Sequence, residues 1–262
     1  MWSSERTRHE KVTKKEFTSQ SGAMQEAKVF TEVDVINRIN AAVLRNGRRI
    51  KVLDVGCGPG ILTVALAPLV DEVVALDLTP EMIDQAKKKS DLLGLKNVRF
   101  EVGRAEELPF SDGYFDVVVT RLMLHHLLSP MSAIEEMARV TRKGGLLVVA
   151  DIVTSEKQAE AKLHNALETL RDPSHIRALT ELELDSILNS ELKIVAKKGW
   201  VNEREFREWI RITNAPEREE PLCVVMRALS EAGLTAGVNL RVEDDIIKFD
   251  HRWVLVTAEK IS

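Results

Sequence analysis

The sequence predicts an α/β fold in which helices cover both faces of a mostly parallel sheet. Short apolar runs alternate with helix-length segments from residue 51 to residue 152, a pattern typical of parallel sheets that are buried on both sides. The first apolar run leads into the stretch LDVGCGPG at residues 53–60, with glycines at alternate positions. Because ligands of such sheets bind beyond the carboxyl ends of the strands, these glycines mark the expected ligand edge.

Five strands and three helices are expected in the first part of the chain. The apolar runs predict strands at residues 51–55, 72–78, 98–103, 115–121 and 145–152. Residues 61–70 are long enough for a short helix. Thr79 and Pro80 provide an N-cap and a first helical residue for a helix that ends at Gly94. Residues 129–145 are predicted to be helical, with a basic last turn and a glycine stop.

The alternation lapses after Asp151. Helices are expected at residues 155–171, from about residue 180, at 201–213 and at 219–233, and strands at 192–200 and 252–260. The total is seven strands in one domain of residues 1–262. Within it we expect a ligand-binding core at 48–152 and helical inserts at 153–180 and 202–245 on the acceptor side. Residues 1–30 are expected to form a lid segment whose helix is short or mobile until a ligand binds.

Composition restricts the classes of function. The chain is 44% hydrophobic and 30% charged, and its net charge is 37 − 41 = −4, which gives no electrostatic reason to expect nucleic acid. Cys57 and Cys223 are its two cysteines, so a disulfide framework is not expected. No apolar run reaches the roughly 18 residues of a membrane span, and the charged N-terminus lacks the features of a signal peptide. These features predict a cytoplasmic protein.

The glycine spacing separates two kinds of nucleotide site. A dinucleotide fingerprint, G-x-G-x-x-G, would need a glycine at position 61, where Ile61 stands. Pro59 removes a backbone donor that an anion site would use. The pattern therefore favours a backbone that passes beside an uncharged or cationic group. Asp77, at the end of the second strand, suits a ribose diol because its two oxygens can accept both hydroxyl hydrogens.

Four blocks of the sequence closely resemble class I S-adenosylmethionine-dependent methyltransferases. These blocks are VLDVGCGPG, VVALDLTPEMIDQAKKK, VGRAEELPFSDGYFDVVVTRLMLHHL and RKGGLLVVAD. The similarity is greatest to the group typified by ubiquinone and menaquinone biosynthesis, also called methyltransferase type 11. It is strong over residues 50–151 and extends less specifically through LRDPSHIR at 170–177. It implies a Rossmann-like seven-stranded sheet with helical lid inserts, and S-adenosyl-L-methionine as cofactor, with S-adenosyl-L-homocysteine as product.

The resemblance also implies roles for residues at the ligand edge. The glycine loop would pass under the methionine part and the sugar, Asp54 would orient the cofactor's amino group, and Asp77 would hold the ribose. Leu78 would pack on the adenine. Many members have an acidic residue where this chain has Arg104, which lacks an acceptor, so Glu106 or a backbone carbonyl is expected to replace it. The full predicted cofactor set is Asp54, Gly56, Cys57, Gly58, Gly60, Asp77, Leu78, Arg104, Ala105, Thr120 and Arg121.

Histidines after the fourth strand are the candidates for proton transfer. His125 and His126 lie near the methyl group in this fold, and a histidine titrates near neutral pH. The alternative is that one of them packs against the sheet or holds a loop. No metal site is expected, since neighbouring histidines on a helix face different directions and no third ligand stands at a fixed spacing.

Polar residues of the inserts are candidates for the acceptor pocket. They could equally form an exposed helix–turn–helix, and the tryptophan could be part of the core. An arginine among them could bind a carboxylate or phosphate. The predicted acceptor residues are His164, Arg171, His175, Arg177 and Trp209.

The function predicted from these patterns is methyl transfer to a small-molecule acceptor by in-line displacement. The main alternative is a non-catalytic S-adenosylmethionine-binding or interaction module of the same fold. A nicotinamide dehydrogenase is disfavoured by Ile61, and no basic stripe supports an RNA-modifying enzyme. The expected partners are the acceptor and, in a homodimer, a second copy of the chain, with no nucleic acid.

Overall fold

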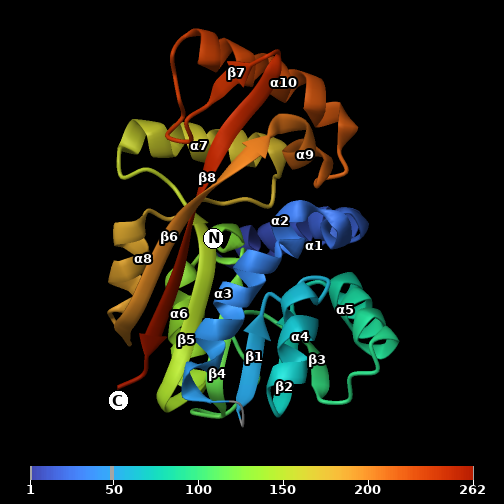
Figure 1. The fold of residues 1–262 in the computed structure, drawn as a ribbon, viewed down its shortest axis with the longest axis vertical. Helices are drawn as coiled ribbons and strands as arrows, with labels where there is room; N and C mark the ends of the chain where they lie inside the picture. The colour runs from blue at the N-terminus through green and yellow to red at the C-terminus, as the bar shows by residue number, and fades with distance from the viewer. Residues whose placement is uncertain (1, 48–49, 262) are drawn as a thin grey trace.

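The computed structural model describes residues 2–47 and 50–261, and the domain boundaries predicted at residues 1, 48 and 262 lie outside this part. The strands form one sheet in the order β3-β2-β1-β4-β5-β8-β6, with β7 pairing with β8 (Figure 1). β1 to β5 run parallel, and β8 runs antiparallel to both β5 and β6. The strands are β1 Lys51–Val55, β2 Glu72–Asp77, β3 Val98–Val102, β4 Phe115–Arg121, β5 Thr141–Val153, β6 Lys193–Glu205, β7 Arg241–Glu243 and β8 Ile246–Glu259. The mostly parallel α/β fold is confirmed, and β7 adds an eighth strand to the seven predicted.

Helices cover both faces of this sheet. Because side chains alternate along a strand, Val52 of β1 faces a cluster with α3, α4 and α5, while Leu53 and Val55 face α6 and α8. Burying each such side chain contributes about 1.5–3 kcal/mol. The helices are α1 Trp2–Glu26, α2 Lys28–Thr31, α3 Val33–Val43, α4 Ile61–Leu66, α5 Pro80–Leu92, α6 Pro130–Val140, α7 Gln158–Arg171, α8 Glu181–Leu188, α9 Phe206–Arg211 and α10 Glu219–Glu231.

The insert residues form an apolar cluster of their own beyond the ligand edge. β6 and β8 extend past the rest of the sheet, and α7, α9 and α10 pack around their far ends (Figure 1). Trp209 and Phe249 are fully buried at the centre of this cluster, with ring centroids 5.0 Å apart. We call α7, α9, α10 and the far ends of β6 and β8 the insert unit, which faces the ligand edge.

Two predicted helices are shorter in the structure because residues at one end of each pair with a neighbouring strand instead. Residues 141–145, predicted to end a helix, belong to β5, where Thr141 pairs with Phe115. Residues 201–205, predicted to begin a helix, continue β6, since β8 reaches back to Ile246 and pairs Lys248 with Glu205. α3 and β7 lie in segments for which the sequence analysis predicted no element.

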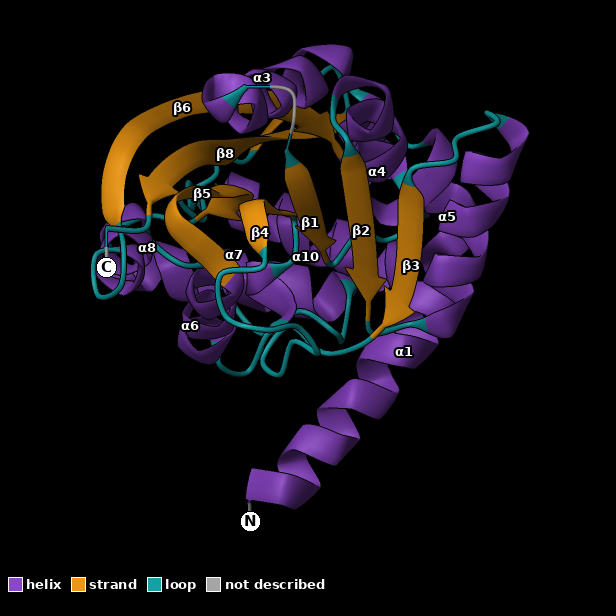
Figure 2. Cartoon of the chain, turned by 90° about the horizontal axis from the view of Figure 1, so that it is seen from below, coloured by secondary structure: helices purple, strands orange, loops and turns teal. Residues whose placement is uncertain are grey.

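The N-terminal segment forms a longer helix than predicted. α1 spans 25 residues, not a short stretch. It passes the carboxyl ends of β2 and β3 (Figure 2) and lies between the sheet and the insert unit (Figure 1). Three contacts fix it there: Gln20 donates to Asp172 at 2.9 Å, Arg218 pairs with Glu16 at 2.8 Å, and His9 contacts the carbonyl of His126 at 2.7 Å. α1 therefore covers the ligand edge.

Candidate functional site

The glycine loop turns sharply between β1 and α4. Gly56 and Gly60 have φ angles of 70° and 79°, in the left-handed region that favours glycine. At Gly60 a Cβ atom would also stand 2.7 Å from the Cβ of Ala86 on α5. The alternate glycines therefore allow both the turn and the close approach of α5.

Asp77 connects this loop to the next strand. Its Oδ2 accepts the backbone N–H of Gly58 at 2.9 Å, and its Oδ1 accepts that of Thr79 at 2.8 Å. Thr79 stands at the N-cap of α5, but its hydroxyl makes no capping bond. Burial raises the pKa of Asp77, while these bonds oppose the rise. Each carboxylate oxygen has a second lone pair, so Asp77 can still accept from two hydroxyl groups.

Asp54 is the buried carboxylate beneath the loop. Its Oδ2 accepts the hydroxyl of Thr63 at 2.6 Å. Burial raises the pKa of Asp54 to about 6, and the bond from Thr63 and the charge of Arg121 limit this rise. The carboxylate is therefore costly to ionise unless a cation lies beside it.

A cavity of about 1090 Å³, including its open mouth, lies over the ends of β1 to β4 and beneath α1. Nine of the eleven predicted cofactor residues line it: Asp54, Gly56, Cys57, Gly58, Asp77, Leu78, Arg104, Ala105 and Arg121.

Gly60 and Thr120, the other two predicted cofactor residues, do not line the cavity. Gly60 serves the turn, and the hydroxyl of Thr120 donates to the carbonyl of Val55 at 2.9 Å, so it joins β4 to β1. Arg121 lines the cavity but donates to the carbonyls of Phe30 and Val29, at 2.9 and 2.6 Å, which holds α2 in place. Burial lowers the pKa of Arg121 to about 10, so it stays charged at neutral pH.

The departure at Arg104 involves α1. The guanidinium pairs with Glu10 of α1 and lies 3.3 Å from Glu106. All three side chains line the cavity. Glu106, which was predicted as a replacement acceptor, therefore lies at the site, but its carboxylate also forms an ion pair with Arg104.

His125 and His126 lie in a 3₁₀ turn after β4 and differ in their surroundings. The Nδ1 of His125 lies 2.6 Å from Asp151. Burial opposes the charged form of His125, but Asp151 outweighs it and raises the pKa. Burial and the neighbouring His125 lower the pKa of His126 to about 4, so His126 is neutral at pH 7.

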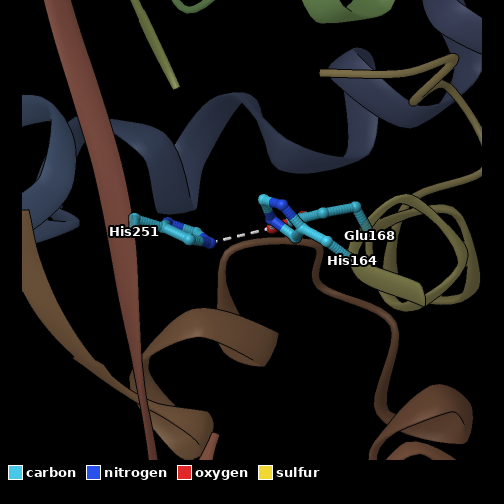
Figure 3. A group of neighbouring side chains, drawn as sticks. All are labelled: His164, Glu168 and His251. Atoms are coloured by element: carbon cyan, nitrogen blue, oxygen red, sulfur yellow. Dashed lines mark hydrogen bonds and ion pairs between the residues drawn. The ribbon is translucent and has the colours of Figure 1, made fainter. Parts of the chain in front are cut away.

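His164, a predicted acceptor residue, is buried behind the acceptor side. It lies on α7 beside Glu168 and near His251 of β8 (Figure 3). Its Nδ1 is 3.1 Å from the hydroxyl of Thr154. Arg177 is exposed, pairs with Glu183 at 2.9 Å and is not among the residues that line the cavity.

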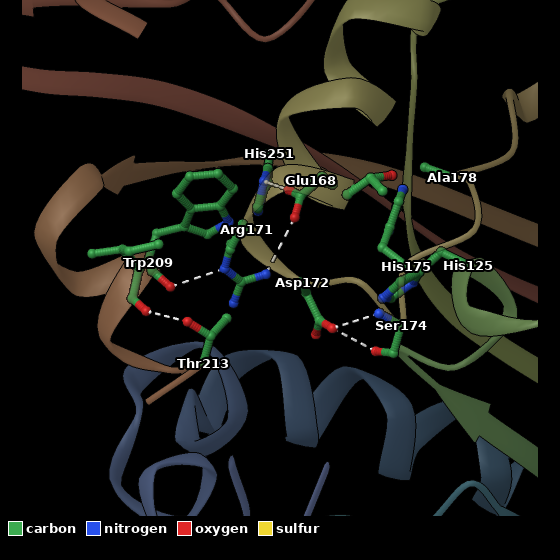
Figure 4. Close-up of polar contacts among 12 residues, drawn as sticks. His125, Glu168, Arg171, Asp172, Ser174, His175, Ala178, Trp209, Thr213 and His251 are labelled. Atoms are coloured by element: carbon green, nitrogen blue, oxygen red, sulfur yellow. Dashed lines mark hydrogen bonds and ion pairs between the residues drawn. The ribbon is translucent and has the colours of Figure 1, made fainter. Parts of the chain in front are cut away.

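A second cavity of about 600 Å³ adjoins the first. Three predicted acceptor residues, Arg171, His175 and Trp209, line it together with His125 and His126. Figure 4 shows the polar contacts around Arg171, His175 and Trp209. Arg171 donates to the carbonyl of Trp209 at 3.0 Å, and His175 contacts the side chain of Asn165 at 2.8 Å. Five residues line both cavities: Phe17, Met24, Phe30, Leu122 and His126. The two cavities therefore share a wall formed by these five residues, and we call the second one the acceptor chamber after the acceptor residues that the sequence predicted there.

Sequence reasoning missed several residues of this site. Glu168, Arg204 and His251 line the acceptor chamber, and α1 supplies Phe17 and Gln20. Their positions depend on the length of β6 and β8 and on the docking of α1, which leave no local pattern. Asp151 was detectable, because it follows the fifth strand at the ligand edge.

Known proteins similar to this chain share its fold and sequence pattern. A family model described as a methyltransferase domain matches residues 46–205. A Bacillus subtilis protein named uncharacterized methyltransferase YcgJ is 30% identical over 248 residues, covering 93% of this chain and 97% of the relative. Demethylmenaquinone methyltransferase of Bacillus cereus is 41% identical over 101 residues, covering 37% and 43%. A crystal structure of a Bacillus halodurans C-125 protein described as a methyltransferase superposes with a TM-score of 0.81 at 27% identity, covering 87% of this chain and 99% of that one.

Proposed function

This chain belongs to the class I S-adenosylmethionine-dependent methyltransferases, and from this premise we propose that it methylates a small molecule held in the acceptor chamber. The observation that carries the proposal is the set of five residues that line both cavities. We propose that a ligand in the first cavity and an acceptor in the second approach each other beside these residues. In-line displacement needs this arrangement of nucleophile, methyl carbon and sulfur.

The residues of the first cavity fit the cofactor. The carboxylate of Asp77 retains acceptor capacity for a ribose diol, and the bare backbone of Gly56 and Gly58 permits close approach. A cationic amino group beside Asp54 would offset the cost of ionising that buried carboxylate. Leu78 and Ala105 provide an apolar wall for a base. We assign Asp54 and Asp77 to the amino group and the ribose on these grounds.

The bound cofactor supplies both the methyl group and a neutral sulfur leaving group, so the protein's task is alignment and exclusion of water. α1 and the insert unit enclose the acceptor chamber between them. We propose that residues 1–30 and the inserts act as the cover of the site, and that the core of residues 48–152 holds the cofactor. Water exclusion strengthens the electrostatic interactions inside.

Among the two predicted histidines, we propose His125 as the proton acceptor of the chamber. Asp151 holds its Nδ1 at 2.6 Å and would stabilise the imidazolium that forms. His126, with a pKa of about 4, is a weak base. It is better suited to forming the wall shared by the two cavities, where Phe17 packs against it with ring centroids 4.8 Å apart.

The test is incorporation of labelled methyl groups. The full chain is incubated with methyl-labelled S-adenosylmethionine and a metabolite extract, and the small-molecule, protein and RNA fractions are counted separately. Label in the small-molecule fraction, abolished by Asp77→Ala, is the expected result. Cofactor binding with no label in any fraction would favour the non-catalytic binding module. Label in protein or RNA would contradict the small-molecule acceptor.

A further inference from the structure

Three ligand-type side chains from two distant segments converge beside the acceptor chamber. His164 and Glu168 stand one turn apart on α7, and His251 projects from β8 (Figure 3). The Nε2 atoms of His251 and His164 lie 2.9 and 3.7 Å from Oε1 of Glu168. One ligand atom from each residue lies within 4.8 Å of the others, and all three residues are buried. No other such group of three is found in the part of the chain that the structure describes.

The donor set and its spacing match a transition-metal site. Two imidazoles and one carboxylate are the ligands of many catalytic zinc and non-haem iron sites, which keep further positions open. Ligand atoms about 2.1 Å from a tetrahedral ion lie roughly 3.4 Å from one another. The separations of 2.9 and 3.7 Å bracket this value, so small side-chain shifts would seat an ion.

A second observation concerns His164, whose Nε2 is buried and has no hydrogen-bond partner among the described residues. Its other ring nitrogen is fixed by the hydroxyl of Thr154 at 3.1 Å. Donation from Nδ1 to Thr154 leaves the lone pair of Nε2 directed at the cluster. This is the outer-shell arrangement that orients metal-binding histidines. A buried polar atom without a partner is costly, and a metal ion would remove this cost.

Two arginines lie near the cluster, and their positive charges oppose the binding of a cation there. Arg171 lies 3.2 Å from Oε2 of Glu168, whereas both histidines approach Oε1. Arg204 lines the same chamber, and its Nη2 lies 3.4 Å from Glu208. Arg171 therefore shares Glu168 with the cluster, whereas Arg204 faces Glu208. The competing state is a metal-free cluster in which His251 donates to Glu168.

We propose that His164, Glu168 and His251 bind a divalent first-row transition ion of the Zn²⁺ or Fe²⁺ type. Glu168 and His251 line the acceptor chamber, whereas His164 does not. The open positions of the ion therefore face the chamber and suit an oxygen or nitrogen atom of the acceptor. This role in acceptor binding depends on the proposed methyl transfer; the metal site itself does not.

The test is Co²⁺ and Zn²⁺ binding by the full chain after treatment with a chelator. Co²⁺ is titrated and its visible absorption bands are followed, and calorimetry with Zn²⁺ gives the stoichiometry. One saturable ion per chain is expected. Glu168→Gln should weaken binding at least about 100-fold. Thr154→Val keeps all three ligands and should weaken it about 10-fold, as outer-shell changes do.

His175→Gln is the matched control, because His175 is a buried histidine that lines the same chamber outside the cluster. It should retain Co²⁺ affinity within about twofold. Circular dichroism verifies that each variant is folded, and Thr154→Val remains informative if Glu168→Gln does not fold. Absence of saturable binding by the wild-type chain would overturn the proposal and leave the metal-free cluster. Binding that survives Glu168→Gln but is lost in His175→Gln would place the ion elsewhere and also overturn it.

Calorimetry with S-adenosyl-L-homocysteine on the same metal-stripped samples separates the two proposals. If S-adenosyl-L-homocysteine binds and methyl transfer occurs but Co²⁺ does not bind, only the proposal of a metal site fails. If Co²⁺ binds and no acceptor is methylated, the proposed function alone fails.

Discussion

Oδ2 of Asp77 accepts a hydrogen bond from the backbone N–H of Gly58 at 2.9 Å, which joins the end of β2 to the glycine loop that follows β1. The same carboxylate also holds the backbone of Thr79 at the start of α5. A single side chain therefore shapes the loop and presents acceptors to the cavity.

Asp77→Ala should weaken S-adenosyl-L-homocysteine binding about 100-fold or more, because two charge-assisted hydrogen bonds to the ribose would be lost. Calorimetry measures the change. Asp84→Ala removes an exposed carboxylate on α5 and should leave the affinity within about twofold. Equal losses of S-adenosyl-L-homocysteine affinity in the two variants would contradict the assignment of Asp77 to the ribose.

Cofactor affinity should rise with pH through the titration of Asp54. Burial raises the pKa of this carboxyl from 3.8 to about 6, so it is largely protonated at pH 5 and ionised at pH 7. Only the ionised form attracts the cofactor's ammonium group, so affinity should increase about tenfold between these pH values. Calorimetry between pH 5 and pH 7 measures this change in cofactor affinity. Asp54→Asn should bind more weakly at pH 7, with a flat profile; an unchanged profile would assign the pH dependence to another group.

Gly60→Ala and Gly58→Ala form a matched pair for stability. Both glycines have positive φ, but only at Gly60 would a Cβ meet neighbouring atoms, those of Ala86 on α5. Gly58→Ala should cost about 1 kcal/mol from backbone strain alone. Gly60→Ala should cost about 2–4 kcal/mol, since steric overlap is added. Urea unfolding measures both, and similar losses would contradict the close packing of α5 on the loop.

The pairing of α1 with the insert unit should contribute to stability through Glu16. Arg218 holds Glu16 through two bonds of 2.8 and 3.0 Å, and the side chain of Glu16 is 7% exposed. Glu16→Gln should lower the free energy of unfolding by about 1–3 kcal/mol. Glu217→Gln alters the exposed partner of the same arginine, at 3.8 Å, and should cost less than about 0.5 kcal/mol. If both variants unfold alike in urea, α1 is not held by this pair.

Elements and site residues with local sequence signals were predicted best. The strand ends, the glycine loop and the acidic residues at 54 and 77 follow from apolar runs and turn residues, and β1 and β4 have the predicted bounds. Pairing between distant strands was not visible: β8 determines where β6 ends, and with it the positions of Arg204 and His251. The docking of α1 depends on contacts such as Gln20 with Asp172, which are 152 residues apart. For the same reason the cluster of His164, Glu168 and His251 has no signature in residue spacing.

The central claim is that the sugar of S-adenosylmethionine is held by Asp77 at the end of β2, with its amino-acid tail over the glycine loop. A crystal structure of the chain with S-adenosyl-L-homocysteine tests this most directly. Both ribose hydroxyls are expected within about 3.2 Å of the carboxylate oxygens of Asp77, with the amino group on the side of Asp54. S-adenosyl-L-homocysteine bound elsewhere, or with its ribose out of reach of Asp77, would contradict the assignment of Asp77 to the ribose.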